Sequence, residues 1–266
     1  MRLRALLGLP LAVALLVAGC GSSADAPAEG GGPSSGESGL TGTLTVFAAA
    51  SLTDVFTGLG DQLMRENPQL EVRFNFAGSS ALATQLTQGA PADVFASANE
   101  SQMAVVTDAG LAADDPTTFT ENVLEIAVPA GNPGGVTGLD DFADPDLALA
   151  VCAAAVPCGA AAAQVFEAAG ITPVPDTEEE DVRAALTKVQ LGEVDAALVY
   201  ASDVRSAGDD VEGIPFPEAE EAVNEYPVCV LADAPNPAAA RAFADLVLSA
   251  DGQAALEAAG FRAPPA

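Results

Sequence analysis

The 266-residue sequence contains no histidine. Catalytic Ser-His and Cys-His pairs and histidine-bound metal ions are therefore excluded. Basic residues are also scarce, because 9 Lys and Arg stand against 38 Asp and Glu, which gives a formal net charge of -29. So acidic a chain argues against binding to nucleic acid and against docking on anionic lipid by charge. A small anion is not excluded as a ligand, because salt screens long-range repulsion beyond about 8 Å.

The first twenty residues, MRLRALLGLPLAVALLVAGC, contain two arginines, an apolar core and small residues before Cys20. This pattern is typical of a secretory signal and is too short for a membrane-spanning helix. Its last residues resemble a bacterial lipoprotein cleavage site, which implies a signal peptide over residues 1–19 and a lipid on Cys20. The alternative is an ordinary signal peptide with an unmodified cysteine. Residues 20–42 add a Gly-, Ser- and Pro-rich segment that predicts a flexible tether.

Short apolar runs alternate with helical patterns over the rest of the chain, and no later segment is apolar enough to cross a membrane. The runs predict strands at 44–47, 71–76, 93–96, 124–128, 147–151, 196–200 and 228–231. The helical patterns lie at 53–66, 80–88, 100–109, 159–169, 179–190, 237–248 and 252–259. Such alternation is typical of an α/β protein with mainly parallel sheets flanked by helices. Breaks near residues 120–122 and 226–227 predict two lobes with a ligand cleft between them.

Small or polar residues recur where the predicted strands and helices meet. Ser51 in FAAASLTDVF, Ser79 in FAGSSALATQL and Cys158 in VPCGAAAAQ lie at helix starts. Val182 in EEEDVRAALTKV lies in the first turn of a helix opened by acidic residues, and Tyr200 in ALVYASDV ends a strand. Taken singly, each has an ordinary explanation as a cap or a core residue.

Ser51 illustrates the choice between structure and function. Ser51 and Asp54 have the spacing of a capping box, in which the serine caps the following helix. The alternative is that the helix N-terminus binds a negatively charged ligand through its backbone N–H groups. The ten residues around Ser51 favour capping, and both roles can coexist.

The segments VFAAASLTDVF, FAGSSALATQL, GAPADVFASA, VPCG, EDVRAALTKV, GEVDAALVYASD and EYPV, in this order, resemble the periplasmic molybdate-binding proteins of ABC importers. The similarity extends from about Thr43 to Phe261. It implies a two-lobed type II solute-binding fold that closes on a tetrahedral oxyanion. Lobe I would comprise residues 43–122 plus 223–266, and lobe II residues 123–222.

The resemblance also implies the ligand contacts. They fall on Ser51, Ser79, Cys158, Val182 and Tyr200. The family often has alanine where this chain has Cys158, so a backbone N–H is the expected donor there. No Arg or Lys occupies these positions, and we expect Arg183 to face solvent or a surface carboxylate. Hydroxyls and N–H groups at positively polarised helix N-termini would bind the anion instead.

The function implied is that of a lipid-anchored protein on the outer face of the cell membrane. It would capture molybdate, and tungstate as well, for an ABC permease. We expect a monomer without catalytic activity, a cofactor, a free metal cation or a nucleic-acid partner. Alternatives are a carrier for another oxyanion such as sulfate, an anion sensor, and an enzyme with Ser51 as nucleophile, which lacks a candidate base.

Three cysteines remain if Cys20 carries a lipid, and an exported chain is normally oxidised. Cys152 and Cys158 are six positions apart, at the end of a predicted strand and the start of the next helix. Cys229 lies in the apolar run PVCVLA. We therefore predict a Cys152–Cys158 disulfide and a free, buried Cys229, because an odd count leaves one thiol unpaired. The alternative is three buried free thiols.

Overall fold

A computed structural model of the chain describes residues 39–265. The predicted signal peptide, the lipidation site at Cys20 and most of the predicted tether lie outside the described residues. From Gly39 onwards the chain forms one compact unit. In this described part, no helix combines the length and the apolar character that crossing a membrane requires.

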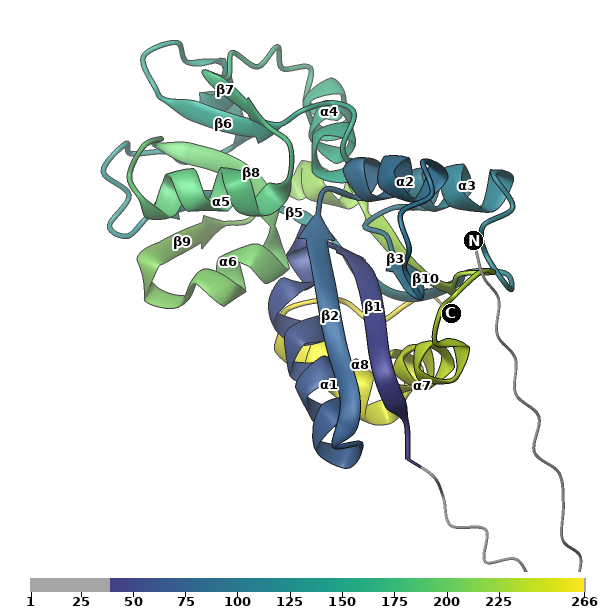
Figure 1. The fold of residues 1–266 in the computed structure, drawn as a ribbon. Helices are drawn as coiled ribbons and strands as arrows, with labels where there is room; N and C mark the ends of the chain where they lie inside the picture. Colours follow the sequence, from purple (N-terminus) through teal and green to yellow (C-terminus); the bar gives the residue numbers. More distant parts are fainter. Residues whose placement is uncertain (1–38, 266) are drawn as a thin grey trace, which may run out of the picture. The chain divides into compact units, whose positions relative to one another are not determined.

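The first sheet has the strand order β2-β1-β3-β10-β4 (Figure 1). Its strands are β1 (Thr41–Ala49), β2 (Gln69–Ala77), β3 (Val94–Ala96), β4 (Thr117–Asn122) and β10 (Asn224–Val230). Strands β2, β1 and β3 are parallel, with Val46 opposite both Phe74 and Val94. Strand β10 runs antiparallel to both β3 and β4. Five helices flank the sheet: α1 (Thr53–Glu66), α2 (Ser79–Thr87), α3 (Glu100–Asp108), α7 (Pro237–Leu248) and α8 (Ala250–Ala258).

The second sheet has the order β7-β6-β8-β5-β9. Its strands are β5 (Leu124–Pro129), β6 (Leu149–Cys152), β7 (Thr177–Glu179), β8 (Ala196–Tyr200) and β9 (Val211–Ile214). Strands β7, β6 and β8 are parallel, and β5 runs antiparallel to β8 and β9. Its helices are α4 (Pro157–Ala169), α5 (Val182–Gln190) and α6 (Ala201–Ala207).

The two sheets define a first and a second lobe, and the predicted α/β two-lobed fold is confirmed. In each sheet one strand, β10 or β5, runs against all the others, so the sheets are mixed but mainly parallel. The chain passes from the first sheet to the second at Val123, between β4 and β5. It returns through a 3-10 helix, η4 (Pro217–Ala222), which precedes β10.

The apolar periodicity of the helices explains how they pack against the sheets. In α1 the buried residues include Val55, Phe56, Leu59 and Leu63, which share one helix face. Phe56 packs edge-on against Phe243 of α7, with ring centroids 5.3 Å apart. Burying a side chain of this size contributes about 1.5–3 kcal/mol to stability.

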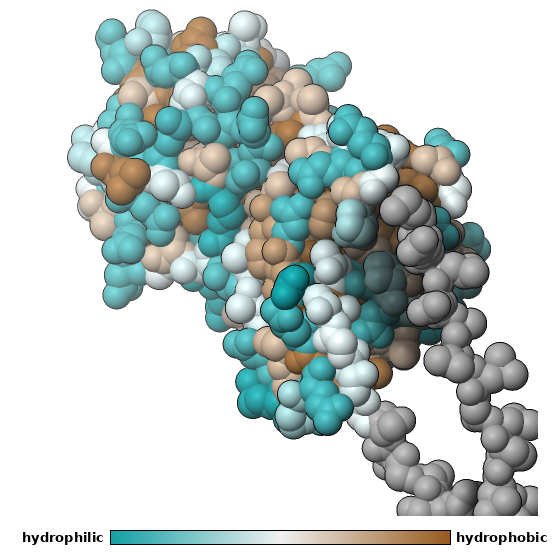
Figure 2. Space-filling view, in the orientation of Figure 1, coloured by the Kyte–Doolittle hydropathy of each residue, from teal (hydrophilic) through white to brown (hydrophobic). Residues whose placement is uncertain are grey.

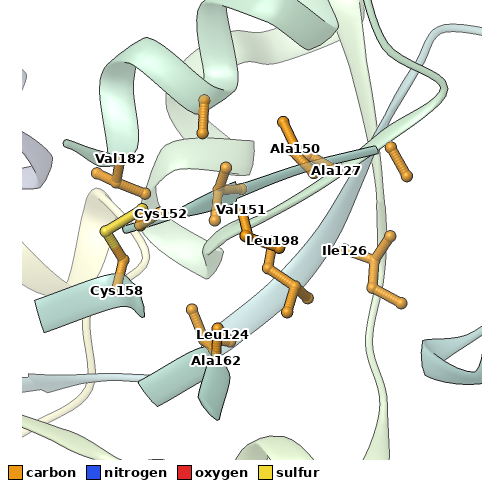
Figure 3. Packing of buried hydrophobic residues seen from close by; sticks show 14 of the residues in the cluster. Leu124, Ile126, Ala127, Ala150, Val151, Cys152, Cys158, Ala162, Val182 and Leu198 are labelled. Carbon is orange, nitrogen blue, oxygen red and sulfur yellow. A yellow bond between two sulfur atoms is a disulfide. The ribbon is translucent and has the colours of Figure 1, made fainter. Parts of the chain in front are cut away.

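The second lobe has a separate core between its sheet and helices. Strands β5 and β8 contribute Leu124, Ile126 and Leu198, which are almost completely buried (Figure 3). On the outside, hydrophilic residues are interspersed with apolar ones over the face shown in Figure 2. The exposed large apolar side chains of the described residues are separated along the chain: Val105, Val174, Leu191, Val223 and Leu248.

One predicted helix start is wrong. The pattern at EEEDVRAALTKV predicts a helix from Glu179, whereas Glu179 ends β7 and the helix begins at Val182. Asp181 is the N-cap, and its side chain accepts a hydrogen bond from the backbone N–H of Ala184. The acidic residues before Asp181 therefore belong to a polar edge strand and a turn.

Candidate ligand-binding site

A small cavity lies where the two lobes meet. It is lined by Ala49, Ala50, Ser51, Ala77, Gly78, Ser79, Ala98, Val156, Pro157, Cys158, Asp181, Val182 and Tyr200. The structure thus brings together all five residues that the sequence predicts as ligand contacts. Ser51 and Ser79 come from the first lobe, and Cys158, Val182 and Tyr200 from the second. The cavity volume is about 10 Å³, which leaves room for about one water molecule.

The N-termini of α2, α4 and α5 line this cavity, and those of α2 and α4 have no side-chain cap. Helices α1, α2 and α4 have no side-chain cap hydrogen bond. By contrast, α3, α5, α7 and α8 are capped by Asn99, Asp181, Asn236 and Ser249. The first N–H groups of a helix have no partner within the helix. At the uncapped helices they are left available to a ligand, together with the positive end of the helix dipole.

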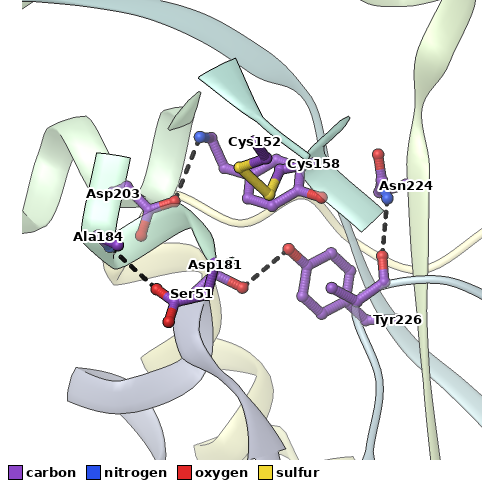
Figure 4. The surroundings of a disulfide bond; sticks show 10 residues. Ser51, Cys152, Cys158, Asp181, Ala184, Asp203, Asn224 and Tyr226 are labelled. Carbon is purple, nitrogen blue, oxygen red and sulfur yellow. Dashed lines mark hydrogen bonds between the residues drawn. A yellow bond between two sulfur atoms is a disulfide. The ribbon is translucent and has the colours of Figure 1, made fainter. Parts of the chain in front are cut away.

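Ser51 does not form the predicted capping box with Asp54. A 3-10 turn, η1 (Ala50–Leu52), separates β1 from α1, and Leu52 occupies the N-cap position instead. The extra turn moves Ser51 away from the N–H groups that it would cap. Its Oγ lies 2.9 Å from the Oη of Tyr226, and both residues are buried (Figure 4). Sequence reasoning did not assign a role to Tyr226, although it lies in the EYPV motif.

Ser79 is the first residue of α2 and is 1% exposed. Its Oγ accepts a hydrogen bond from the backbone N–H of Ala98 at 3.0 Å. In this bond the hydroxyl oxygen of Ser79 is the acceptor, so the hydroxyl proton remains free to be donated towards the cavity.

Tyr200 places a buried hydroxyl at the cavity. Its Oη has no hydrogen-bond partner among the described residues, and the ring meets that of Tyr226 edge-on at 6.0 Å. Burial raises the pKa of Tyr200 well above its usual value, so the hydroxyl stays protonated and is a donor. Leaving such a group unpaired costs about 1–3 kcal/mol, and few native hydroxyls are left so.

Cys158 and Val182 have no side-chain donor, so each can donate a hydrogen bond to a ligand only from its backbone N–H. Cys158 forms a disulfide with Cys152, with the two Cα atoms 5.7 Å apart, so it has no thiol proton to donate (Figure 4). The side chain of Val182 is packed in the core of the second lobe (Figure 3). Cys229 is a free, buried thiol, and burial raises its pKa to about 12.

Gly78 allows the lobes to approach closely beside the cavity. A Cβ atom on Gly78 would lie 2.4 Å from the carbonyl oxygen of Glu180 in the second lobe. No larger residue fits there without moving the backbone, so this N-cap position of α2 requires glycine while the lobes are together.

Arg183 has a larger role than the sequence predicts. It pairs with the exposed carboxylate of Asp54, as expected of a residue facing a surface acid. Its Nε also lies 3.0 Å from Oδ1 of the fully buried Asp203. Burial raises the pKa of Asp203 to about 7, while the Arg183 charge acts in the opposite direction. The other oxygen of Asp203 accepts a hydrogen bond from the backbone N–H of Tyr200 at 3.2 Å.

The profile of the bacterial extracellular solute-binding proteins matches residues 44–262. The chain belongs to this family. It is 45% identical over 257 residues to the molybdate-binding protein ModA of Mycobacterium tuberculosis, covering 96% of this chain and 97% of the relative. Among the described residues, no group of three or more Cys, Asp and Glu side chains could hold a metal ion.

Two solved structures share the fold. The periplasmic molybdate-binding protein of Azotobacter vinelandii is 19% identical, with a TM-score of 0.74 and coverage of 84% of this chain and 100% of that one. The sulfate-binding protein SubI of Mycobacterium tuberculosis is 18% identical, with a TM-score of 0.68 over 83% and 86% of the two chains.

Proposed function

We propose that this solute-binding protein captures molybdate in the cavity between its lobes and delivers it to an ABC importer. The observation that carries the proposal is the buried hydroxyl of Tyr200, which has no hydrogen-bond partner among the described residues and belongs to a residue that lines the cavity together with the N-termini of α2, α4 and α5. A bound oxyanion would pair all of these donors at once. The similarity to ModA along nearly the whole chain selects molybdate among the oxyanions.

The proposed donors come in two kinds. Ser51, Ser79 and Tyr200 offer hydroxyl protons, while Cys158 and Val182 offer backbone N–H groups. If Tyr226 donates to the Oγ of Ser51, the proton of Ser51 is free for the anion, as that of Ser79 is. Each charge-assisted bond contributes about 1.5–3 kcal/mol, which together offset the cost of association without any cationic side chain.

The cavity has to widen to admit an anion with four oxygens, because it has room for about one water molecule. Two lobes joined by two crossings can do this by a hinge motion. The chain crosses at Val123 and again after η4, and the adjacent residues Asn122 and Asn224 face each other in the first sheet. We propose that these crossings are the hinge, with lobe I at residues 43–122 and 223–266 and lobe II at 123–222.

Anion selectivity follows from the donor chemistry. A cavity lined mainly by donors favours fully deprotonated oxyanions, since the proton of hydrogen phosphate would find few acceptors. Asp181 also lines the cavity, and one of its two carboxylate oxygens, Oδ1, accepts the N–H of Ala184. Tungstate has the same charge and shape as molybdate, so we propose that it binds too. Sulfate is the second candidate, because the sulfate-binding protein SubI has the same fold.

Calorimetric titration with molybdate, tungstate, sulfate and phosphate tests this function. We expect sub-micromolar affinity for molybdate and tungstate, and phosphate binding at least tenfold weaker than molybdate. Sulfate binding tighter than molybdate would support the second candidate. Phosphate binding within tenfold of molybdate would contradict a site made of donors.

The N-terminal residues support a proposed location. A signal peptide over residues 1–19, a lipid on Cys20 and a tether to residue 42 would hold a monomeric, non-catalytic binding protein at the outer face of the cell membrane. Replacing Cys20→Ser should release the protein from the membrane fraction into the medium or periplasm. Continued membrane association of this variant would count against the lipid anchor.

A further inference from the structure

Two arginines of the second lobe contact the first lobe beside the cavity. Arg183 of α5 pairs with Asp54, in the first turn of α1. Arg205 of α6 donates from Nε to the carbonyl oxygen of Ala258, the last residue of α8, at 2.6 Å. Both arginines face a pocket of about 300 Å³ at the lobe interface, which Ser51 and Asp54 also line. In a chain with only 9 Lys and Arg, this placement is not explained by the anion contacts, which contain neither residue.

The charges at both contacts favour lobe association. The cationic side chain of Arg205 contacts the C-terminal end of α8, where the helix dipole is negative. The Arg183 guanidinium lies between two carboxylates, the exposed Asp54 across the lobe interface and the buried Asp203 in its own lobe. The Nε of Arg183 and the Oδ1 of Asp203 lie 3.0 Å apart but form no hydrogen bond among the described residues, so this contact is an ion pair alone.

Arg183 is also connected to the binding residues on both sides. Asp203 accepts a hydrogen bond from the backbone N–H of Tyr200, and Asp54, in the first turn of α1, lies three positions after Ser51. The contact between Arg183 and Asp54 therefore connects the surroundings of two proposed ligand contacts, Ser51 in the first lobe and Tyr200 in the second. It can form only when the lobes are together, because its partners lie in different lobes.

We propose that Arg183 and Arg205 form an interlobe clasp that holds the lobes closed, with Arg183 as the positioning residue that sets how long a bound oxyanion is retained. The clasp rests on the proposed function for its ligand, but its contacts are made by protein groups alone. It should therefore slow dissociation of the ligand while leaving association nearly unchanged. It should also bias the ligand-free protein towards closed lobes.

The first test measures molybdate association and dissociation rates by stopped flow. Asp54→Asn should raise the dissociation rate about two- to fivefold, the range expected for a partly exposed ion pair, and the effect should shrink at 1 M salt. Asp61→Asn is the matched control, because Asp61 is an exposed residue of the same helix and loses the same charge. Asp54→Glu should restore slow dissociation. Equal dissociation rates for the Asn variants at positions 54 and 61 would overturn the clasp.

The Arg205 contact has its own matched control. Arg205→Met should also speed dissociation, whereas Arg241→Met, at an exposed position of α7, should not. Combining Asp54→Asn with Arg183→Met should add little to the effect of Arg183→Met alone, because Asp54 has already lost its partner once Arg183 is replaced. Fully additive effects of these two changes would show that the residues do not act together.

A second readout does not depend on the ligand. Spin labels on cysteines introduced at the exposed positions Glu66 and Gln190 report the distance between the lobes. In ligand-free protein, Asp54→Asn should shift this distribution to longer distances relative to Asp61→Asn, and identical distributions would contradict the clasp. If the wild-type protein fails to bind molybdate, the proposed function fails, whereas the label distances still decide whether the clasp exists.

Discussion

Replacing Tyr200→Phe should change stability and affinity in opposite directions. In the ligand-free protein the Tyr200 hydroxyl is buried and has no partner within residues 39–265, which costs about 1–3 kcal/mol. Its removal should raise the free energy of unfolding by up to that amount, because the ring keeps its contact with Tyr226. If the hydroxyl binds the oxyanion, the same change removes about 1.5–3 kcal/mol of binding, or about 10- to 150-fold in affinity.

Urea unfolding of the ligand-free protein and calorimetric titration with molybdate measure the two effects. Tyr226→Phe is the matched control, since this hydroxyl is equally buried but is paired with Ser51. It should lower stability by about 0.5–1.5 kcal/mol. A Tyr200→Phe variant that is less stable than wild type and binds molybdate equally well would refute the reasoning.

Three further changes test the site. Ser51→Ala should weaken molybdate binding by about 1–3 kcal/mol and lower stability by leaving the Tyr226 hydroxyl unpaired, whereas an unchanged affinity would remove Ser51 from the site. Reducing the Cys152–Cys158 disulfide should lower stability by only about 2 kcal/mol, because the loop is so short. It should weaken molybdate binding by more than this, because the bridge holds the start of α4. Calorimetry with and without reductant measures the effect on binding. Asp203 has a pKa of about 7 in the folded protein against an ordinary 3.8, so the native state retains a proton that the unfolded chain releases, and stability should fall as pH rises from about 4 to about 7. Asp203→Asn should remove up to about 4 kcal/mol of this change in stability. If urea-derived stability depends on pH in the same way in both proteins, the assignment is contradicted.

Elements with strong apolar patterns could be predicted from the sequence. Helix α1 shows its buried face at Val55, Phe56, Leu59 and Leu63, and the interior strands β5 and β8 are nearly continuous apolar runs. The unpredicted strands β4, β7 and β9 all lie at sheet edges. An edge strand pairs on one side only, so its sequence needs little apolar character, as TEE in β7 shows. The short helix α6 likewise consists of small and polar residues.

The site was predictable only where motifs mark it. Resemblance to a known family indicated five cavity residues, but no local pattern could indicate their partners. Ser51 and Tyr226 are 175 positions apart, and Arg183 and Asp54 are 129 apart. The capping spacing around Ser51 was misleading because a 3-10 turn precedes α1, and local spacing does not distinguish that turn from a direct strand-to-helix junction.

The interior position of β10, between β3 and β4 in the first sheet, has a consequence for how the molecule is assembled. Cys229 of β10 pairs with Phe95 of β3, and Val228 pairs with Thr117 of β4, so the late strand separates two early ones. All strands of the second sheet, in contrast, lie within residues 124–214. During synthesis the second lobe can therefore complete its sheet while the first still lacks the interior strand β10. Joining β10 to β3 requires closure of a long loop, which is entropically costly and slow. The first lobe should thus be the last to become resistant to proteases.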